Sequence, residues 1–231
     1  LAWTTTPGLY WTAQENDEWL RAGTLLLELL AAAGCRRVVM MGSCAEYDWS
    51  TGERCTESST PLHPATAYGR AKNTLRERPE ALGQTGPMTT AWARLFFPYG
   101  PGEARARLVP SVILSLMAGE RVRCSHGNQV RDYLYVSDVA SALVRLLASE
   151  ASGPVNIASG TAVRIRDIVL RLATRLGHSD AVDFGALPVA PDDPPFLVAD
   201  VSRLTAELGW KPGVDLDTGL DLAISWWSRS A

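Results

Sequence analysis

The feature that most constrains this sequence is an alternation of short apolar runs with segments of helical periodicity. Residues 15–33 place apolar side chains at helical spacing and stop before Gly34, and residues 38–41 form an apolar run with the length of a buried strand. Residues 65–82 read as a second helix and residues 89–97 as a second strand. Helices that alternate with apolar strands are typical of a parallel sheet that is covered on both faces. We therefore predict an α/β fold with a doubly wound parallel sheet.

Beyond Gly102 the predicted elements become shorter. Periodicity predicts helices at about residues 110–118, from 137 or 138, and at 164–176, 201–208 and 216–227, and strands at 132–136 and 155–158. Asp200 is placed to cap the helix at 201–208. This change divides the chain into residues 1–102, which carry the sheet, and residues 103–231, a small C-terminal α/β lobe, with residues 130–160 returning to the sheet.

Composition excludes several classes of protein. The net charge is −3 and the basic residues are scattered, so nothing indicates a nucleic-acid partner. The apolar stretches are too short to cross a bilayer and no leader opens the chain, which predicts a cytoplasmic protein without a membrane partner. Cys35, Cys44, Cys55 and Cys124 show no CxxC spacing and the three histidines are isolated in sequence. This pattern predicts reduced thiols and no metal site.

Tyr68 and Lys72 form a candidate catalytic pair. They stand four residues apart on the helix predicted for residues 65–82, so both side chains leave the same face. An ammonium beside a phenol favours the phenolate and lowers a pKa that is about 10 when unperturbed, which prepares a tyrosine to act as an acid or a base. The alternative is a structural pair in which Tyr68 is packed and Lys72 is solvated.

Ser43 ends the apolar run that precedes this helix. A residue at that point lies at the carboxyl edge of a parallel sheet, where such folds bind ligands. Its hydroxyl can hold a substrate carbonyl or hydroxyl toward Tyr68, and the alternative is a serine that closes a turn or caps a helix. The combination of Ser43, Tyr68 and Lys72 favours a catalytic site over the separate structural interpretations.

These residues and their surroundings resemble the extended short-chain dehydrogenase/reductase family, in its branch of nucleotide-sugar epimerases, dehydratases and reductases. The matching stretches, in family order, are residues 38–47, 68–72, 94–102 (RLFFPYGPG), 127–139 (GNQVRDYLYVSDV), 155–160 (VNIASG) and 200–212 (DVSRLTAELGWKP). The resemblance implies a Rossmann-like fold, NAD or NADP as cofactor and a nucleotide sugar as substrate. Residues 1–102 would then be the remainder of the NAD(P)-binding domain with the catalytic residues, and residues 103–231 mainly the substrate-binding lobe.

The resemblance also implies the roles of the candidate catalytic residues. Tyr68 is the acid/base, Lys72 positions Tyr68 and the nicotinamide ribose, and Ser43 hydrogen-bonds the reacting sugar oxygen. The cofactor carries the hydride while the protein orients the reactants. Ala2 and Trp3 fall near the nicotinamide end of the cofactor, with packing at a strand end as the alternative role for Trp3.

Two arginines are implied as anchors of the substrate diphosphate, because a guanidinium fork matches phosphate oxygens. Arg131 has the stronger claim, and Arg107, which opens the run RLVPSV, has the weaker one. The alternative for Arg131 is a surface ion pair with Asp132 or Asp138.

Several positions depart from the family's pattern around the sugar. Phe97 stands where many members carry an asparagine that contacts substrate phosphate, and phenylalanine cannot donate that hydrogen bond. Cys44 and Ala45 stand where dehydratases carry acidic residues, and the acidic Glu46 is displaced by comparison. We predict that Cys44, Glu46 and Phe97 line a substrate pocket specific to this subgroup.

The glycine fingerprint that cradles a dinucleotide diphosphate is not found in the sequence. The chain begins where the family's fourth strand would be ending, which predicts an N-terminally shortened member without about two βα units. Such a chain would expose apolar faces and an unpaired sheet edge. We therefore predict poor solubility or an obligate homo-oligomer.

Three functions stay open at this point. The leading interpretation is an NAD(P)-dependent reductase or epimerase that acts at C4 of a nucleotide-linked keto- or deoxysugar. A sugar-nucleotide dehydratase is an alternative that the residues after Ser43 disfavour. A degenerate, non-catalytic sugar-nucleotide binding or scaffold protein is the alternative from another class.

Overall fold

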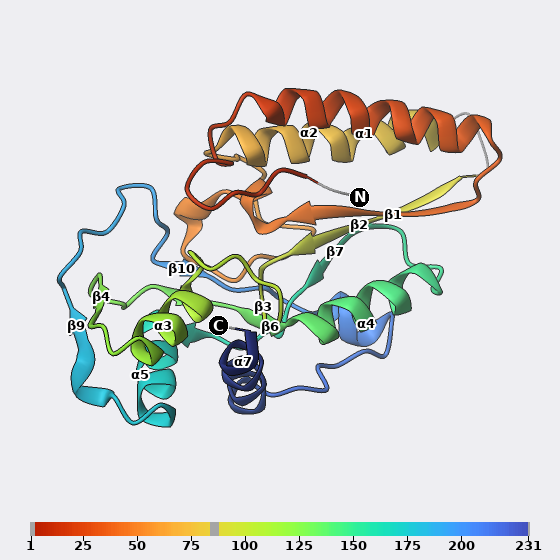
Figure 1. The fold of residues 1–231 in the computed structure, drawn as a ribbon. Coiled ribbons are helices and arrows are strands. Elements are labelled where there is room, and N and C mark those ends of the chain that lie inside the picture. Colours follow the sequence, from red (N-terminus) through yellow and green to blue (C-terminus); the bar gives the residue numbers. More distant parts are fainter. Residues whose placement is uncertain (1–2, 84–87, 231) are drawn as a thin grey trace.

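The computed structural model describes residues 3–83 and 88–230. Its central feature is a parallel sheet in the order β1–β2–β7, formed by β1 (Arg37–Ser43), β2 (Thr89–Leu95) and β7 (Gly153–Ile157). The three strands read as almost continuous apolar runs because helices cover both faces of the sheet (Figure 1). The fold is therefore α/β with a Rossmann-like parallel sheet, as predicted.

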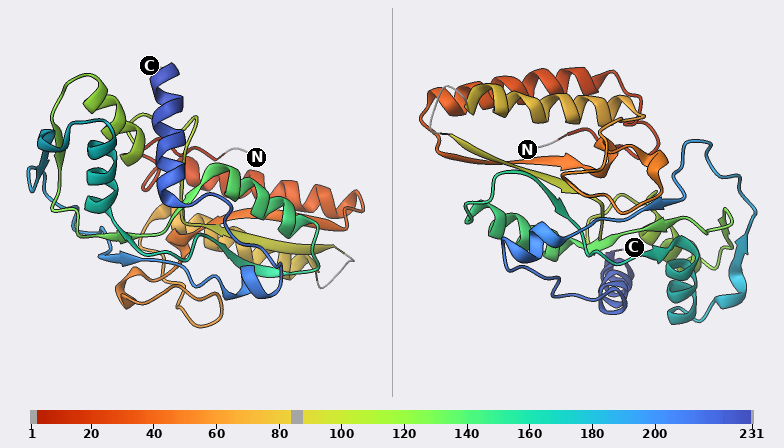
Figure 2. Two further views of the ribbon diagram at one scale, coloured as in Figure 1. Left: turned by 90° about the horizontal axis from the view of Figure 1, so that it is seen from below. Right: turned by 180° about the vertical axis from the view of Figure 1, so that it is seen from behind.

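Two long helices cover one face of this sheet and one helix covers the other. In Figures 1 and 2, α1 (Glu15–Ala32) and α2 (Ala67–Gly83) lie side by side on one face, and α4 (Val136–Leu147) lies on the opposite face. Because β7 comes from the second half of the sequence, the sheet unites segments far apart in the chain.

A second lobe gathers at the lower left of Figure 1 around its own hydrophobic cluster. Its helices are α3 (Leu108–Met117), α5 (Ile165–Arg175) and α7 (Leu216–Ser230). Short strands pair around them as β4 with β9, β3 with β6, and β10–β5–β8. Their bounds are Phe97–Tyr99 (β3), Val122–Cys124 (β4), Val130–Arg131 (β5), Tyr133–Tyr135 (β6), Val163–Arg164 (β8), Val182–Phe184 (β9) and Phe196–Leu197 (β10). The remaining elements are η1 (Cys44–Glu46), η2 (Trp49–Thr51), η3 (Ser179–Ala181) and α6 (Ser202–Ala206).

One predicted strand is divided in the structure and another is shortened. The strand predicted for residues 89–97 ends at Leu95, and β3 then pairs with β6 in a separate sheet. The strand predicted for residues 132–136 is shortened to β6 at Tyr133–Tyr135, because Asp132 lies outside the strand and Val136 begins α4. The buried carboxylate of Asp132 accepts hydrogen bonds from the backbone amides of Ser159 (2.8 Å) and Gly160 (3.0 Å). Sequence periodicity does not record such long-range bonds, and a continuous strand was therefore the wrong prediction.

The helix predicted for residues 201–208 is shorter than expected. It extends over Ser202–Ala206, and Val201 occupies the capping position instead of Asp200. The Asp200 carboxylate still accepts a hydrogen bond from the Ser202 amide (2.8 Å), so it satisfies a donor at the start of this helix.

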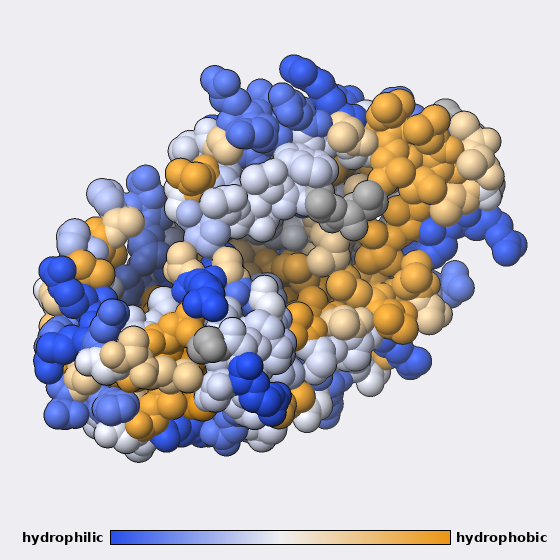
Figure 3. Space-filling view, viewed as in Figure 1, coloured by the Kyte–Doolittle hydropathy of each residue, from blue (hydrophilic) through white to orange (hydrophobic). Residues whose placement is uncertain are grey.

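Apolar side chains gather on the face shown in Figure 3, over α1 and α4. Leu25 and Leu29 on α1 are 55% and 59% exposed, and Val144 and Leu147 on α4 are 68% and 51% exposed. Exposed apolar surface of this kind favours contact with another protein surface. Self-association of the chain stays a prediction.

Candidate functional site

The site begins where β1 ends at Ser43 and the short helix η1 starts. The Ser43 hydroxyl accepts a hydrogen bond from the Ala45 amide (3.2 Å), and the Glu46 carboxylate accepts one from the Ser43 amide (2.8 Å). This reciprocal pair is a capping box, so Ser43 does cap a helix. A hydroxyl that accepts one hydrogen bond still has its own proton to donate, so the cap leaves Ser43 free to act on a second group.

Tyr68 reaches Ser43 because α2 packs tightly against η1. A Cβ atom at Gly69 would lie 2.2 Å from the carbonyl oxygen of Ala45, so only glycine allows this approach. Tyr68 and Ser43 are each 9% exposed, and the Ser43 hydroxyl lies near enough to that of Tyr68 to offset part of the rise that burial causes in its pKa. The structure therefore brings the predicted serine and tyrosine together at the carboxyl edge of the sheet.

Lys72 completes the predicted set from the next turn of α2. Its ammonium donates a hydrogen bond to the Met41 carbonyl (2.9 Å) and lies 3.8 Å from the centre of the Trp3 ring. The side chain is 5% exposed, which contradicts the alternative of a solvated lysine. Burial disfavours the charged form and lowers the pKa of Lys72 to about 8.

The expected effect on Tyr68 is reversed in the structure. Burial raises the pKa of Tyr68 above its ordinary value, and the Ser43 hydroxyl only partly opposes this effect. The Lys72 ammonium is 5.7 Å from the centre of the Tyr68 ring. The cost of placing a phenolate among packed rings outweighs the attraction of a cation at this distance. Tyr68 is thus a neutral phenol near pH 7, in a state to donate a proton.

Aromatic rings surround Tyr68, and of these the sequence reasoning named only Trp3. Tyr10 and Trp11 meet the Tyr68 ring edge to face, with centroid separations of 4.9 and 5.8 Å, and Trp3 does so at 6.0 Å. Trp11 in turn meets Trp49 at 5.9 Å. The only signal in the sequence was the density of aromatic residues in two loops, and their convergence on Tyr68 depends on the packing of those loops.

Behind Ser43 lies a fully buried ion pair between Glu46 and Arg94. The Arg94 Nε donates to the Glu46 carboxylate at 2.8 Å, and the two side chains are 0% and 1% exposed. Trp92 also donates to this carboxylate (2.9 Å). Arg94 then donates to the Tyr47 hydroxyl (3.0 Å), which donates to Asn156 on β7 (2.8 Å). This chain of hydrogen bonds ties the end of β1 to its neighbour β2 and, beyond β2, to β7.

The position of Glu46 does not fit the predicted contact with substrate. Its carboxylate oxygens accept hydrogen bonds from the Ser43 amide, the Trp92 indole and Arg94. A carboxylate that is buried and occupied in this way is out of reach of a ligand. Glu46 instead holds the backbone of Ser43 in place.

Cys44 and Phe97 lie beside the site in different settings. Cys44 is 5% exposed and its carbonyl accepts a hydrogen bond from the Trp49 indole (3.1 Å). Burial raises the pKa of its thiol, so Cys44 stays protonated. Phe97 is half-buried and its ring lies 5.6 Å from the Arg131 guanidinium and 5.6 Å from the Tyr133 ring. Contact of either residue with substrate stays a prediction.

Arg131 is buried and faces a carboxylate that neither prediction named. Its guanidinium is paired with Asp193 and donates to the Val130 carbonyl (2.8 Å). The two alternative partners are engaged elsewhere, because Asp132 accepts from the Ser159 region and Asp138 accepts from the Val214 amide (2.9 Å). A surface ion pair with either aspartate is therefore excluded as the role of Arg131.

Arg107 lies between Tyr10, one of the rings around Tyr68, and the buried acid Glu103. Its Nε donates to Glu103 (3.4 Å), and the same guanidinium lies near enough to the Tyr10 hydroxyl to offset part of the rise that burial causes in its pKa. Burial raises the pKa of Glu103 to about 7. Because Tyr10 also contacts the Tyr68 ring, one side chain, that of Tyr10, separates Arg107 from the candidate acid Tyr68.

Arg131 and Arg107 lie in the same part of the molecule as the Ser43–Tyr68 pair, because their charges affect the pKa values of neighbouring residues. Burial raises the pKa of the Cys44 thiol, next to Ser43, and the positive charge of Arg131 opposes part of this rise. Burial also raises the pKa of the Tyr133 hydroxyl, and the charges of Arg131 and Arg107 both oppose part of that rise. Arg131 and Arg107 are therefore within electrostatic range of residues that surround the Ser43–Tyr68 pair. Trp3 lies on the Lys72 side of this pair, and Ala2, the other predicted cofactor contact, lies outside the described residues.

A family model described as the NAD dependent epimerase/dehydratase family matches residues 9–158. This match spans the Ser43–Tyr68–Lys72 constellation and the central sheet. The chain belongs to this family. Family membership accounts for the conjunction of a serine at a strand end with a tyrosine and a lysine on the following helix, and it leaves the reaction open.

Relatives of this epimerase/dehydratase family member differ in the reactions that their names describe. CDP-abequose synthase from Salmonella typhimurium is 30% identical over 135 residues, which cover 55% of this chain and 45% of the relative. UDP-glucuronic acid decarboxylase 1 from Danio rerio is 29% identical over 172 residues, which cover 73% of this chain and 41% of the relative. The chain thus spans less than half the length of these two curated relatives.

A solved structure of MoeE5 in complex with UDP-glucuronic acid and NAD has a similar fold. Its TM-score is 0.82 at 28% sequence identity, and the match covers 94% of this chain and 75% of MoeE5. That protein was therefore seen with both a nucleotide-linked sugar acid and a nicotinamide cofactor.

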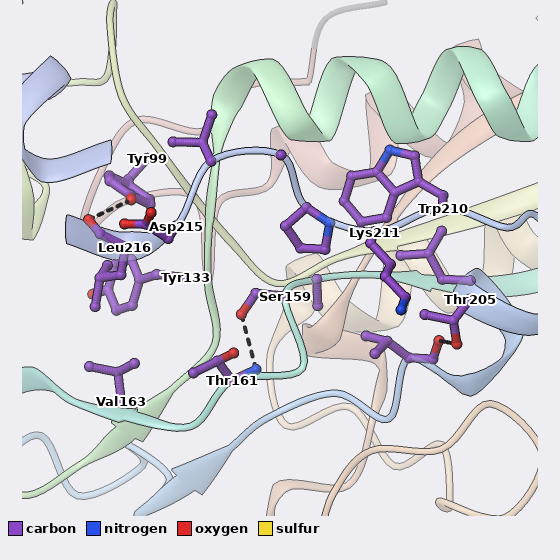
Figure 4. A pocket seen from close by; sticks show the side chains of 16 residues that line it. Tyr99, Tyr133, Ser159, Thr161, Val163, Thr205, Trp210, Lys211, Asp215 and Leu216 are labelled. Atoms are coloured by element: carbon purple, nitrogen blue, oxygen red, sulfur yellow. Dashed lines mark hydrogen bonds between the residues drawn. The ribbon is translucent and has the colours of Figure 1, made fainter. Parts of the chain in front are cut away.

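A separate cavity of about 590 Å³ lies where the segment at residues 210–216 of this family member crosses its second lobe (Figure 4). Its lining includes Tyr99, Tyr133, Ser159 and Lys211. Ser43, Tyr68 and Lys72 do not line it, so this cavity is distinct from the candidate active site.

Neither a metal-binding cluster nor a membrane-spanning helix is found among the described residues. Across residues 3–83 and 88–230, His, Cys, Asp and Glu side chains do not form a group able to hold a metal ion. In the same residues, every helix is too short or too polar to cross a membrane.

The buried ammonium of Lys72 predicts a dependence of stability on pH. Its pKa is about 8 in the folded protein and about 10.4 in an unfolded chain. Between these values the unfolded state binds the extra proton, so the contribution of Lys72 to the free energy of unfolding rises with pH. Below pH 8 both states are protonated and its unfavourable contribution is constant. We expect the stability of Lys72→Met minus that of wild type to decrease as pH rises from about 8 to about 10.4.

Urea denaturation of both proteins at several pH values measures this difference. The control is Lys211→Met, which removes the chain's other lysine from an exposed position. A difference between Lys72→Met and wild type that is flat across this range, or that grows with pH, contradicts the burial of a charged lysine.

Proposed function

We propose that this protein is an NAD(P)-dependent reductase of a nucleotide-linked keto sugar. The observation that carries the proposal is the buried pair of Ser43 and Tyr68, in which Tyr68 is a neutral phenol with Lys72 on the same helix face. Reduction of a ketone requires a proton donor at the carbonyl oxygen, and a phenol with a raised pKa is in the protonated state that this step needs.

The step that fits this geometry is reduction of a sugar ketone to an alcohol. A hydride adds to the carbonyl carbon, the C=O π electrons move to oxygen, and Tyr68 transfers its phenolic proton to that oxygen. Ser43 orients the oxygen by donating its free proton, and the phenolate formed on Tyr68 is stabilised by the positive charge of Lys72. A proton from solvent restores the phenol.

Some of the residues present fit the nicotinamide end of the cofactor. Among the described residues, one acceptor, the Met41 carbonyl, takes one of the three ammonium protons of Lys72, which leaves donors for ribose hydroxyls. Trp3 lies against the same ammonium. When bound, NADH or NADPH supplies the hydride. The neighbour that was solved with NAD supports a cofactor of this type.

A nucleotide sugar is the proposed substrate because of the two guanidinium groups beside the site. Arg131 and Arg107 can each hold an anionic oxygen, and a diphosphate bridges a sugar and a nucleoside. CDP-abequose synthase and UDP-glucuronic acid decarboxylase are named for nucleotide-linked sugars, which supports this class of substrate. Titration with a panel of nucleotide sugars identifies the sugar and the nucleobase. A cytoplasmic location and a homo-oligomeric state stay predictions from the sequence.

The alternatives differ in how well the site supports them. A dehydratase needs an acidic side chain at the substrate, and Glu46 is buried in its ion pair with Arg94. An epimerase would use the same Ser43 and Tyr68, but it also needs the tyrosine as a base, for which a raised pKa is unfavourable. A non-catalytic sugar-nucleotide binding protein would need the arginines without the buried Tyr68–Lys72 pair.

Calorimetric titration of the 231-residue chain tests the proposal. The ligands are NADH, NADPH and a panel of UDP-, dTDP-, CDP- and GDP-sugars. Saturable binding of both a cofactor and a nucleotide sugar, followed by cofactor oxidation with a 4-keto sugar, is the expected result. Binding of a nucleotide sugar without either cofactor would favour the non-catalytic alternative.

Loss of either arginine should weaken nucleotide-sugar binding. Hydrogen bonds to charged groups contribute about 1.5–3 kcal/mol, so Arg131→Gln and Arg107→Gln should each raise the Kd by about 10–150-fold. The control is Arg229→Gln on α7, where the exposed guanidinium only reaches Ser225 (3.0 Å). If the Kd is unchanged in both test variants, the two arginines do not hold the diphosphate.

A further inference from the structure

Two half-buried indoles form a corner beside the candidate acid. The Trp11 and Trp49 rings are 5.9 Å apart and meet at 89°, so they are two perpendicular walls. The Trp11 ring is also 5.8 Å from the Tyr68 ring, at 87°. A molecule whose reacting oxygen lies at Tyr68 therefore has this corner next to it.

Hydrogen bonds connect both tryptophans to the segments that carry Tyr68 and Ser43. The Tyr68 amide donates a hydrogen bond to the Trp11 carbonyl (3.2 Å), and the Trp49 indole donates to the Cys44 carbonyl (3.1 Å), immediately after Ser43. Trp49 opens η2, whose start is capped by the Asp48 carboxylate through the Ser50 amide (2.9 Å). The two walls are thus held in register with the two residues that contact the reacting oxygen.

The corner offers hydrocarbon surface and few hydrogen bonds. The single polar atom of the Trp49 side chain is already used by Cys44, so its ring presents an apolar face. Aromatic faces pack well against C–H groups. A sugar hydroxyl pressed against them would lose its water without gaining a partner, which is unfavourable.

We propose that Trp11 and Trp49 determine specificity by selecting a deoxygenated sugar, with a methyl or methylene group in the corner where a common hexose has a hydroxyl. This inference rests on the proposed function, because it places the sugar carbonyl at Tyr68. It assigns a role to two residues that neither catalyse the reaction nor bind the diphosphate.

Matched ligands separate this inference from the proposed function. Titration with UDP, dTDP, CDP and GDP measures nucleotide binding without a sugar, and the glucose and 6-deoxyglucose forms of the same diphosphates differ by one hydroxyl. We expect the 6-deoxy form to bind about 10–100-fold more tightly, the range for one hydroxyl in an apolar pocket. Diphosphate binding with equal affinity for the two sugars overturns this inference alone. Absence of binding by every diphosphate and nucleotide sugar overturns the proposed function as well.

Substitutions at the corner provide the second test. Trp11→Gln and Trp49→Gln place hydrogen-bonding groups at the walls and should abolish most of the preference, whereas Trp11→Phe and Trp49→Phe keep an apolar face and should retain it. Affinity for the bare diphosphate should stay at the wild-type value in all four variants, which also shows that they fold. Trp226→Ala, in the hydrophobic cluster of the second lobe, is the matched control. A preference that survives in both Gln variants overturns the inference.

Discussion

Replacing Tyr68 with phenylalanine should lower the rate of keto-sugar reduction by about 10²–10⁴-fold, the usual contribution of a positioned general acid. The substitution removes only the phenolic hydroxyl, so the edge-to-face contacts of the ring with Tyr10 and Trp11 remain. Affinity for the nucleotide sugar should change little, because the hydroxyl acts on the oxygen that gains a proton. Single-turnover rates at saturating substrate separate this effect from binding.

Tyr99→Phe is the matched control for this experiment. Its hydroxyl donates a long hydrogen bond to the Leu216 carbonyl (3.4 Å), in the hydrophobic cluster of the second lobe. It should turn over at close to the wild-type rate. Turnover by Tyr68→Phe at the wild-type rate would show that another group donates the proton.

Replacing Arg94 with methionine should destabilise the fold by about 3–5 kcal/mol, because one partner of a buried ion pair is left without the other. The Glu46 carboxylate would keep its hydrogen bonds from Ser43 and Trp92 but lose its only paired cation in a site that is 0% exposed. Neutralising Glu46 as well should restore part of this loss. We therefore expect the double variant Glu46→Gln, Arg94→Met to be more stable than Arg94→Met alone.

Urea denaturation of the two single variants and the double variant measures the coupling. The control is Arg171→Met, whose partner Asp217 is exposed, and a surface pair of this kind contributes only about 0–1 kcal/mol. A loss below about 1 kcal/mol in Arg94→Met, as for such a surface pair, or a double variant that is less stable than both single variants, would contradict the interpretation of a strongly coupled buried pair.

The same ion pair shows why the sequence misjudged Glu46. Glu46 was predicted to line the substrate pocket by comparison with the acidic residues that dehydratases of the family carry after the serine. Its actual partner, Arg94, lies on the neighbouring strand, where register places Gly42 opposite Arg94. A Cβ at Gly42 would lie 2.2 Å from the Trp92 indole, so the glycine makes room for the side chains that enclose Glu46. Strand register across a parallel sheet cannot be read from local spacing.

The pKa of Tyr68 is a second property that local spacing could not supply. The spacing of Tyr68 and Lys72 correctly predicted a shared helix face, but the sign of the pKa shift depends on burial. Tyr10, Trp11 and Trp3, which bury Tyr68, come from a loop and an N-terminal segment whose path is set by tertiary packing.

The sequence by itself determined the α/β fold and the alternation of strands and helices in the first hundred residues, and it placed Tyr68 and Lys72 on one helix face. These features follow from local rules, since periodicity and helical spacing reflect the backbone geometry of single elements. Only the tertiary structure decided that Arg131 faces Asp193, that Glu46 is paired behind the site, and that two indoles stand beside Tyr68. These features arise between elements distant in the chain, where burial and side-chain packing, and not backbone periodicity, set the energy.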